Sequence, residues 1–118
     1  MFKLLQIVGG NVVAEHELTG EPLTIGRNPG NRLQPDDASV SGRHARITLV
    51  PSAYLDDAMD VVLEDLDSTN GTLVNDKPVR RHLLKHGDRV TIGTLEFKFI
   101  DEQTLALGGT RILLQEED

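Results

Sequence analysis

Ser41 and His44 stand three residues apart in the stretch SVSGRHARI, residues 39–47. A serine and a histidine can act as nucleophile and base when an acid orients the histidine, and Asp65 or Asp67 would be the candidate acids. Residues three apart along an extended segment point to different faces, however, and neither a strained nucleophile elbow nor an oxyanion-hole pattern accompanies Ser41. The pattern therefore argues against a hydrolase. For His44 we expect hydrogen bonds to buried backbone groups instead.

Anion binding suits the same residues better than catalysis. Arg27 follows a glycine in TIGRNPGN, and the stretch DLDSTNGTLVN places Ser68, Thr69 and Asn70 just before a glycine. Together with Ser41 these residues offer a guanidinium fork, several hydroxyls, a carboxamide and backbone N–H groups, which is a donor set for a phosphate. We therefore expect a phosphate-binding site if the fold brings the three stretches together.

Metal binding has only a weak signal. His82 and His86 are spaced i, i+4, which puts two ligands on one face only if the segment is helical. The segment RRHLLKHGD is short and ends in Gly-Asp, so a loop with two surface histidines is the expected structure. The chain has no cysteine, which excludes disulfides and cysteine-based metal sites. We expect no metal and no cofactor.

Short alternating apolar runs provide the elements that must position these residues. In the clearest run, LEFKFI, the leucine and the phenylalanines face one way and the charges face the other. Many short strands, separated by turn signals and without long helical periodicity, indicate an all-β, two-sheet sandwich with its binding loops at one end. The runs that we interpret as strands are FKLLQIV (2–8), NVVAEHEL (11–18), PLTIG (22–26), HARITLV (44–50), DVVLEDL (60–66), GTLVN (71–75), DRVTIG (88–93) and LEFKFI (95–100).

The chain of 118 residues has the size of one domain. We assign residues 1–101 to the sandwich. Within them PSAYLDDAMD, residues 51–60, is expected to be a variable loop. After Asp101 the pattern weakens, and residues 102–118 form either a final strand, TRILLQ, or a C-terminal linker.

The charge of the chain limits the classes of partner. A net charge of -7 argues against binding to nucleic acid or to anionic membranes, which requires clustered positive charge. The cations gather in two segments, residues 27–46 and 77–81, which suits a small, focused anion. The N-terminus lacks a signal-peptide pattern, and no segment is long and apolar enough to span a bilayer. We therefore expect a cytoplasmic protein.

The sequence resembles the forkhead-associated (FHA) domain over roughly residues 4–100, on four motifs in the family's order: IGR (25–27), SVSGRHA (39–45), DLDSTNGTLVN (65–75) and LLKHGDRVTIG (83–93). The resemblance implies an eleven-stranded β-sandwich that binds phosphothreonine in partner proteins without catalysing a reaction. It implies phosphate contacts from Arg27 and Ser41, a hydroxyl contact from Thr69, and a hold on the peptide backbone by Asn70. The positions that it marks as architectural are Gly26, His44, Gly71 and Asn75.

The sequence departs from the family pattern beside the predicted phosphate residues. In many members a lysine or arginine follows the motif serine and helps to hold the phosphate. Here Gly42 follows it and offers only its backbone N–H, which predicts a weaker site. Arg43 either swings in to compensate or points along the strand.

A second departure lies in the loops that are expected to set specificity, which contain Arg32, Ser39 and Ser68. Arg32 stands where an acidic or neutral residue is more usual, so it would strengthen the positive field or favour an acidic group on the ligand. Asp36 and Asp37, in the loop before the motif serine, would work against that preference.

These observations predict a non-enzymatic interaction module that recognises a Thr-phosphorylated protein or peptide. Its partners would be a Ser/Thr kinase or the substrate of one, in signalling or in phosphorylation-controlled assembly. The alternative is an FHA-type scaffold that makes phosphate-independent or intramolecular protein contacts. Titration of a phosphothreonine peptide against its unphosphorylated twin distinguishes the two.

Overall fold

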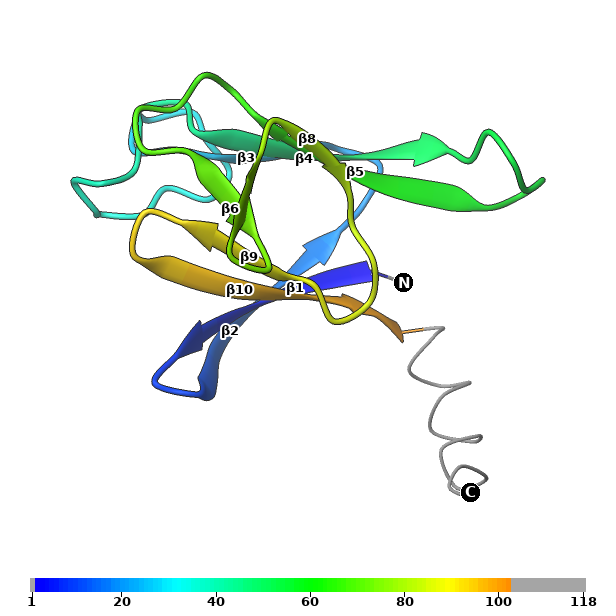
Figure 1. Ribbon diagram of the computed structural model, residues 1–118, viewed down its shortest axis with the longest axis horizontal. Coiled ribbons are helices and arrows are strands. Elements are labelled where there is room, and N and C mark those ends of the chain that lie inside the picture. Colours follow the sequence, from blue (N-terminus) through cyan, green and yellow to red (C-terminus); the bar gives the residue numbers. More distant parts are fainter. Residues whose placement is uncertain (1, 103–118) are drawn as a thin grey trace.

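The computed structural model describes residues 2–102 and consists of two antiparallel β-sheets that pack against each other (Figure 1). One sheet has six strands in the order β2-β1-β10-β9-β6-β7, and the other has four in the order β3-β4-β5-β8. The strands are β1 (Phe2–Val8), β2 (Asn11–Leu18), β3 (Leu23–Ile25), β4 (Ala45–Pro51), β5 (Met59–Asp65), β6 (Thr72–Val74), β7 (Lys77–Val79), β8 (Arg81–Leu83), β9 (Arg89–Ile92) and β10 (Leu95–Asp101).

The predicted two-sheet sandwich is confirmed, and each of the eight runs interpreted as strands overlaps one strand to within one residue at each end. Residues 2–102 hold ten strands, close to the eleven that the resemblance implies, and the run TRILLQ lies outside these residues. Strands β7 and β8 were not among the predicted runs, and β8 lies in the segment RRHLLKHGD that was expected to be a loop. Both are three-residue edge strands, and Pro78 fits in β7 because an edge strand can do without one ladder N–H.

The core between the sheets comes from alternation along the strands. In β10, Phe97 and Phe99 are buried and Lys98 between them is exposed, as the pattern LEFKFI predicts. Burial of a large apolar side chain contributes about 1.5–3 kcal/mol, so this layer stabilises the fold. No helix in the described part of the chain is long and apolar enough to cross a membrane. Among the described residues the fully buried apolar side chains are Leu4, Ile25, Val40, Ala45, Ile47, Leu63, Val90, Ile92, Phe97 and Phe99.

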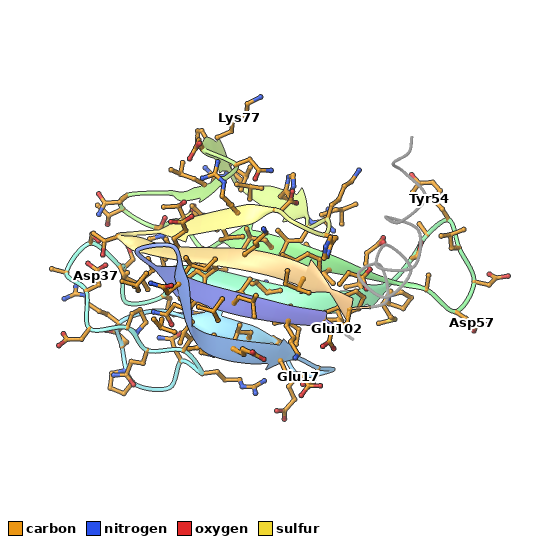
Figure 2. The ribbon with its side chains drawn as sticks, turned by 90° about the horizontal axis from the view of Figure 1, so that it is seen from below. Glu17, Asp37, Tyr54, Asp57, Lys77 and Glu102 are labelled. Atoms are coloured by element: carbon orange, nitrogen blue, oxygen red, sulfur yellow. The ribbon has the colours of Figure 1, made fainter. Side chains whose placement is uncertain are left out.

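Three connections meet at one end of the sandwich, at the left of Figure 1. β10 runs from this end to the other, where Asp101 pairs with Phe2 of β1. The β4–β5 connection, residues 52–58, also lies at that far end, and Figure 2 shows Tyr54 there, remote from Asp37. Three of the connections at the near end are joined by hydrogen bonds and are called the rim below: β3–β4 (26–44), β5–β6 (66–71) and β9–β10 (93–94).

Asn75 has an architectural place in the fold. With Asp76 it forms the two-residue turn between β6 and β7, with φ angles of 51° and 70°. Positive φ at both positions matches a hairpin turn that asparagine tolerates well. The Asn75 side chain accepts a hydrogen bond from the Arg89 backbone N–H (3.0 Å) and donates one to Asp88 (3.0 Å). Asn75 therefore ties this hairpin to β9 at the end of β6 away from the rim.

His16 is a polar residue that faces the core from the edge strand β2. Its ring packs edge-on against Phe97, with centroids 6.4 Å apart, and its Nε2 atom is buried without a hydrogen-bond partner among residues 2–102. Burial lowers the pKa of His16 below its ordinary value of 6.5, because the charged imidazolium is disfavoured there. The unfolded chain therefore takes up this proton first, and the free energy of unfolding decreases as the pH falls below 6.5.

We expect His16→Leu to raise the free energy of unfolding by about 1 kcal/mol at neutral pH, because it removes an unsatisfied buried nitrogen. The variant should also lose part of the wild-type decrease in stability between about pH 7 and about pH 5. Urea unfolding of both proteins across that range measures the difference. Parallel curves for wild type and variant would contradict the role assigned to His16.

Candidate functional site

Arg27 is fixed at the rim by the backbone of the segment that carries Ser41. Its N–H donates to the Ser41 carbonyl (3.0 Å), and its side-chain Nε donates to the Val40 carbonyl (2.8 Å). The Nε bond orients the guanidinium, and Arg27 is exposed, so its two terminal nitrogens remain available to a ligand. Gly26 is required just before it, because a Cβ there would lie 2.2 Å from the Gly42 oxygen.

His44 joins two of the rim connections from the interior of the sandwich. It is fully buried, its Nδ1 accepts the Ser41 backbone N–H (3.0 Å), and its Nε2 donates to the Gly71 carbonyl (2.8 Å). Because Nδ1 is an acceptor, the proton of the neutral ring sits on Nε2. Ser41 and Gly71 are thereby held at a fixed separation.

The hydroxyl of Ser41 is directed to the β5–β6 connection and not to the imidazole. Its Oγ accepts the backbone N–H of Thr69 (2.9 Å), which leaves the hydroxyl proton free for a ligand. Both nitrogens of His44 are engaged with backbone groups, so the histidine is not placed to take a proton from Ser41. This geometry is that of a binding group.

Asp65 shapes the β5–β6 connection from within. It accepts hydrogen bonds from the Ser68 N–H (3.1 Å), from the Ser68 hydroxyl and from the Thr72 hydroxyl (2.7 Å). Burial raises the pKa of Asp65, but the Ser68 and Thr72 hydrogen bonds outweigh it and hold the pKa below its ordinary value. Ser68 also accepts the Gly71 N–H (2.9 Å), so its side chain is occupied inside the turn and not presented as a specificity group.

Asn70 and Thr69 stand exposed at the tip of this connection. The Asn70 amide donates to the Ser39 carbonyl (2.9 Å), which closes a second link between the two connections. Its carbonyl oxygen has no recorded partner among residues 2–102 and stays available to a peptide N–H. A hollow of about 360 Å³ opens beside the tip, lined by Asp65, Ser68, Thr69, Asn70, Gly71, Thr72, Pro78, Val79 and Arg80.

Asp37 supports two of the rim connections, a role that was not predicted from the sequence. It was expected to oppose an acidic ligand, but its carboxylate accepts the Ser39 N–H (2.9 Å), the Ser39 hydroxyl (2.6 Å), the Thr94 N–H (3.1 Å) and the Thr94 hydroxyl. Hydrogen bonds from Ser39, then Thr94, lower the pKa of Asp37 far below its ordinary value. Gly93 makes room, since a Cβ there would lie 2.6 Å from the Ser39 hydroxyl. The available signal was the Asp-x-Ser spacing, which favours a local side-chain turn.

Two of the predicted cations lie apart from the hydrogen-bonded cluster at the rim. Arg32 is exposed and its guanidinium lies 3.8 Å from Glu21. Arg43 is exposed and has no recorded hydrogen bond or ion pair among residues 2–102. It lines a different hollow, together with Thr24, Asn28, Pro29, Gly30 and Asn31. The predicted residues that the structure does bring together are Arg27, Ser41, Gly42, Thr69 and Asn70, with Ser39 beneath them.

The two histidines with metal-ligand spacing do not share a face of a helix. His82 lies in β8, with Nε2 3.3 Å from Asp88, and His86 accepts the Asp101 N–H (3.0 Å). No group of three or more acidic or histidine side chains in the described part of the chain could hold a metal ion. Each histidine instead has a neighbour that explains its position.

Comparisons with known proteins agree on one family. The family model described as "FHA domain" matches residues 23–93. The chain is 39% identical over 98 residues to the glycogen accumulation regulator GarA of Mycobacterium tuberculosis, covering 82% of this chain and 56% of the relative. It is 37% identical over 93 residues to the oxoglutarate dehydrogenase inhibitor of Corynebacterium diphtheriae, covering 79% and 60%. The chain thus spans less than two thirds of these relatives.

A solved structure gives the same likeness in three dimensions. It is described as "Structural and functional analysis of phosphothreonine-dependent FHA domain interactions", and it superposes with a TM-score of 0.70 at 30% identity. The match covers 85% of this chain and 95% of that one.

We expect His44→Leu to lower the free energy of unfolding by about 2–4 kcal/mol, because it leaves the Ser41 N–H and the Gly71 carbonyl without partners. Urea unfolding at neutral pH measures this loss. His82→Leu is the matched control, since it removes a half-exposed ring outside the rim and should cost less than about 1 kcal/mol. Equal losses in the two variants would show that the imidazole of His44 is not what holds the connections.

Proposed function

The chain belongs to the FHA domain family, and we propose that it binds phosphothreonine in partner proteins at the rim. The observation that carries this proposal is the hydrogen bond from the Thr69 N–H to the Ser41 hydroxyl (2.9 Å). It brings two connections that are distant in the sequence to one point, beside the guanidinium of Arg27, so that a charged fork and two hydroxyls face one ligand.

The donor set fits a doubly charged phosphate ester. The terminal nitrogens of Arg27, the hydroxyl protons of Ser41 and Thr69 and the backbone N–H of Gly42 are all available to it. A charge-assisted hydrogen bond to an anion contributes roughly 1.5–3 kcal/mol, about twice a neutral one. Arg27 is therefore expected to dominate the binding energy, and the hydroxyls to orient the phosphate.

The peptide around the phosphothreonine would be held by Asn70. Its Nδ2 already binds the Ser39 carbonyl, so the carboxamide is fixed before a ligand arrives. Its free carbonyl oxygen can accept a peptide N–H, and the hollow beside Thr69 and Asn70 can take a flanking side chain. A side chain fixed in advance loses less conformational entropy on binding.

The chain is an interaction module of a family that includes a regulator and an enzyme inhibitor, as the names of its relatives state. We infer that its partners are substrates of Ser/Thr kinases in the cytoplasm. The net charge of -7 supports a protein partner over nucleic acid or an anionic membrane.

Arg27→Ala should lower the affinity for a phosphothreonine peptide by about tenfold to a hundredfold or more, because it removes charge-assisted hydrogen bonds. A peptide array selects the ligand, and isothermal titration compares it with its unphosphorylated twin. Arg89→Ala is the matched control, since Arg89 pairs with Asp76 away from the rim and its loss should leave the affinity unchanged. Equal binding of both peptides by the wild type would instead support phosphate-independent contacts.

Replacing phosphothreonine by phosphoserine in the same peptide should weaken binding about fourfold to a hundredfold. The single methyl group contributes about 0.8 kcal/mol by transfer and roughly 1–3 kcal/mol in a tight pocket. Titrations with the two peptides measure the ratio. Equal affinities would mean that charge alone recognises the phosphate and that threonine is not selected.

A further inference from the structure

A side chain at position 42 would meet the side chain of Asn28. A Cβ at residue 42 would lie 2.4 Å from Nδ2, 2.7 Å from Cγ and 2.9 Å from Oδ1 of Asn28. All three atoms belong to one carboxamide, so the volume that a side chain at position 42 would enter is filled by Asn28. The two residues form a coupled pair across the rim.

The backbone keeps Asn28 at this place. Its N–H donates to the Gly42 carbonyl (3.1 Å), and its own carbonyl accepts the side-chain amide of Asn31 (2.8 Å). The same Asn31 amide nitrogen also donates to the Gly42 carbonyl (2.8 Å). These hydrogen bonds hold the backbone of Asn28 beside the segment that carries Ser41.

The carboxamide of Asn28 is open to a ligand. Asn28 is exposed, and its side chain has no recorded hydrogen bond within residues 2–102. It lines a hollow of about 370 Å³ together with Arg27, Gln34, Pro35 and Asp36. The carboxylate of Asp36 disfavours an anion on its side of this hollow, so the favourable place for a phosphate is beside Arg27.

We propose that Asn28 is a further ligand of the phosphothreonine phosphate, in place of a side chain at position 42. This inference rests on the proposed function. Asn28 follows Arg27 in the chain, and its amide nitrogen lies 2.4 Å from the place of a Cβ on Gly42, the residue after Ser41. The side chain is thus next in sequence to one predicted phosphate contact and packed against the neighbour of the other. The Asn28 amide would supply a neutral donor where many family members have a lysine or arginine. The phosphate would then keep an additional hydrogen bond without further positive charge.

The first test is the loss of the donor. Asn28→Ala should weaken binding of the phosphothreonine peptide about threefold to tenfold, as expected for one neutral hydrogen bond. Its dependence on salt should match that of wild type, because no charge is removed. Asn11→Ala, in the β1–β2 hairpin, is the matched control and should bind as wild type does. Wild-type affinity in the Asn28→Ala protein would overturn the proposal.

The second test exploits the steric coupling. Gly42→Lys alone should weaken binding, because the new side chain must push the Asn28 carboxamide out of its place beside Gly42. In the double variant Asn28→Gly with Gly42→Lys the space is free, and binding should return to the wild-type level or exceed it, with a steeper salt dependence. Failure of the second substitution to restore any binding, in a double variant that melts as wild type does, would contradict the coupling.

NMR distinguishes a direct contact between Asn28 and the phosphate from an indirect effect of Asn28 on the shape of the loop. In ¹H–¹⁵N NMR spectra, the side-chain amide signals of Asn28, assigned by their loss in Asn28→Ala, should shift with the phosphothreonine peptide and not with its unphosphorylated twin. Signals that stay in place while the wild type binds would refute Asn28 as a ligand and leave the proposed function standing. If the wild type binds no phosphothreonine peptide at all, the proposed function fails, and this inference fails with it.

Discussion

The buried imidazole of His44 is the constraint on which the rim depends. Its two nitrogens bind the backbone of Ser41 and of Gly71, the second of which lies 27 positions after the histidine, and neither nitrogen has solvent to replace the partner it would lose. Ordering a residue costs about 1–2 kcal/mol in conformational entropy, and a loop that is already ordered does not incur that cost when a ligand arrives. The role of the histidine is therefore to fix in advance the separation between the hydroxyl of Ser41 and the tip of the β5–β6 connection.

Acidic side chains support this arrangement, although an anion is the expected ligand. Asp37 accepts hydrogen bonds from Ser39 and from Thr94 of the β9–β10 connection, Asp65 accepts them from Ser68 and Thr72, and the pKa of each carboxylate lies below its ordinary value. They consequently stay ionised at neutral and mildly acidic pH, and the rim keeps its shape there. A locally cationic site is thus compatible with the acidic character of the chain. These two carboxylates bind N–H and hydroxyl groups of the protein itself, not a ligand.

Most of the fold was predictable from the sequence, because alternation along the strands directly encodes which face is buried. β7 and β8 were not, since three-residue edge strands contain too little alternation to recognise and Pro78 is typical of a turn. The residues gathered at the rim followed from the motif order. Arg32 was harder to place, because its surroundings depend on Glu21, which no local pattern links to it. The contact of Asn28 with Gly42 likewise joins residues that only the folded chain brings together.

The pairing of β1 with β10 has a consequence for how such a module can be combined with other proteins. Phe2 and Asp101 are neighbours at the end of the sandwich opposite the rim, separated from it by the seven residues of β10, or roughly 20 Å. Polypeptide joined at either of these points would leave from the same place and on the far side. The rim and these two points of attachment therefore lie at opposite ends of the sandwich.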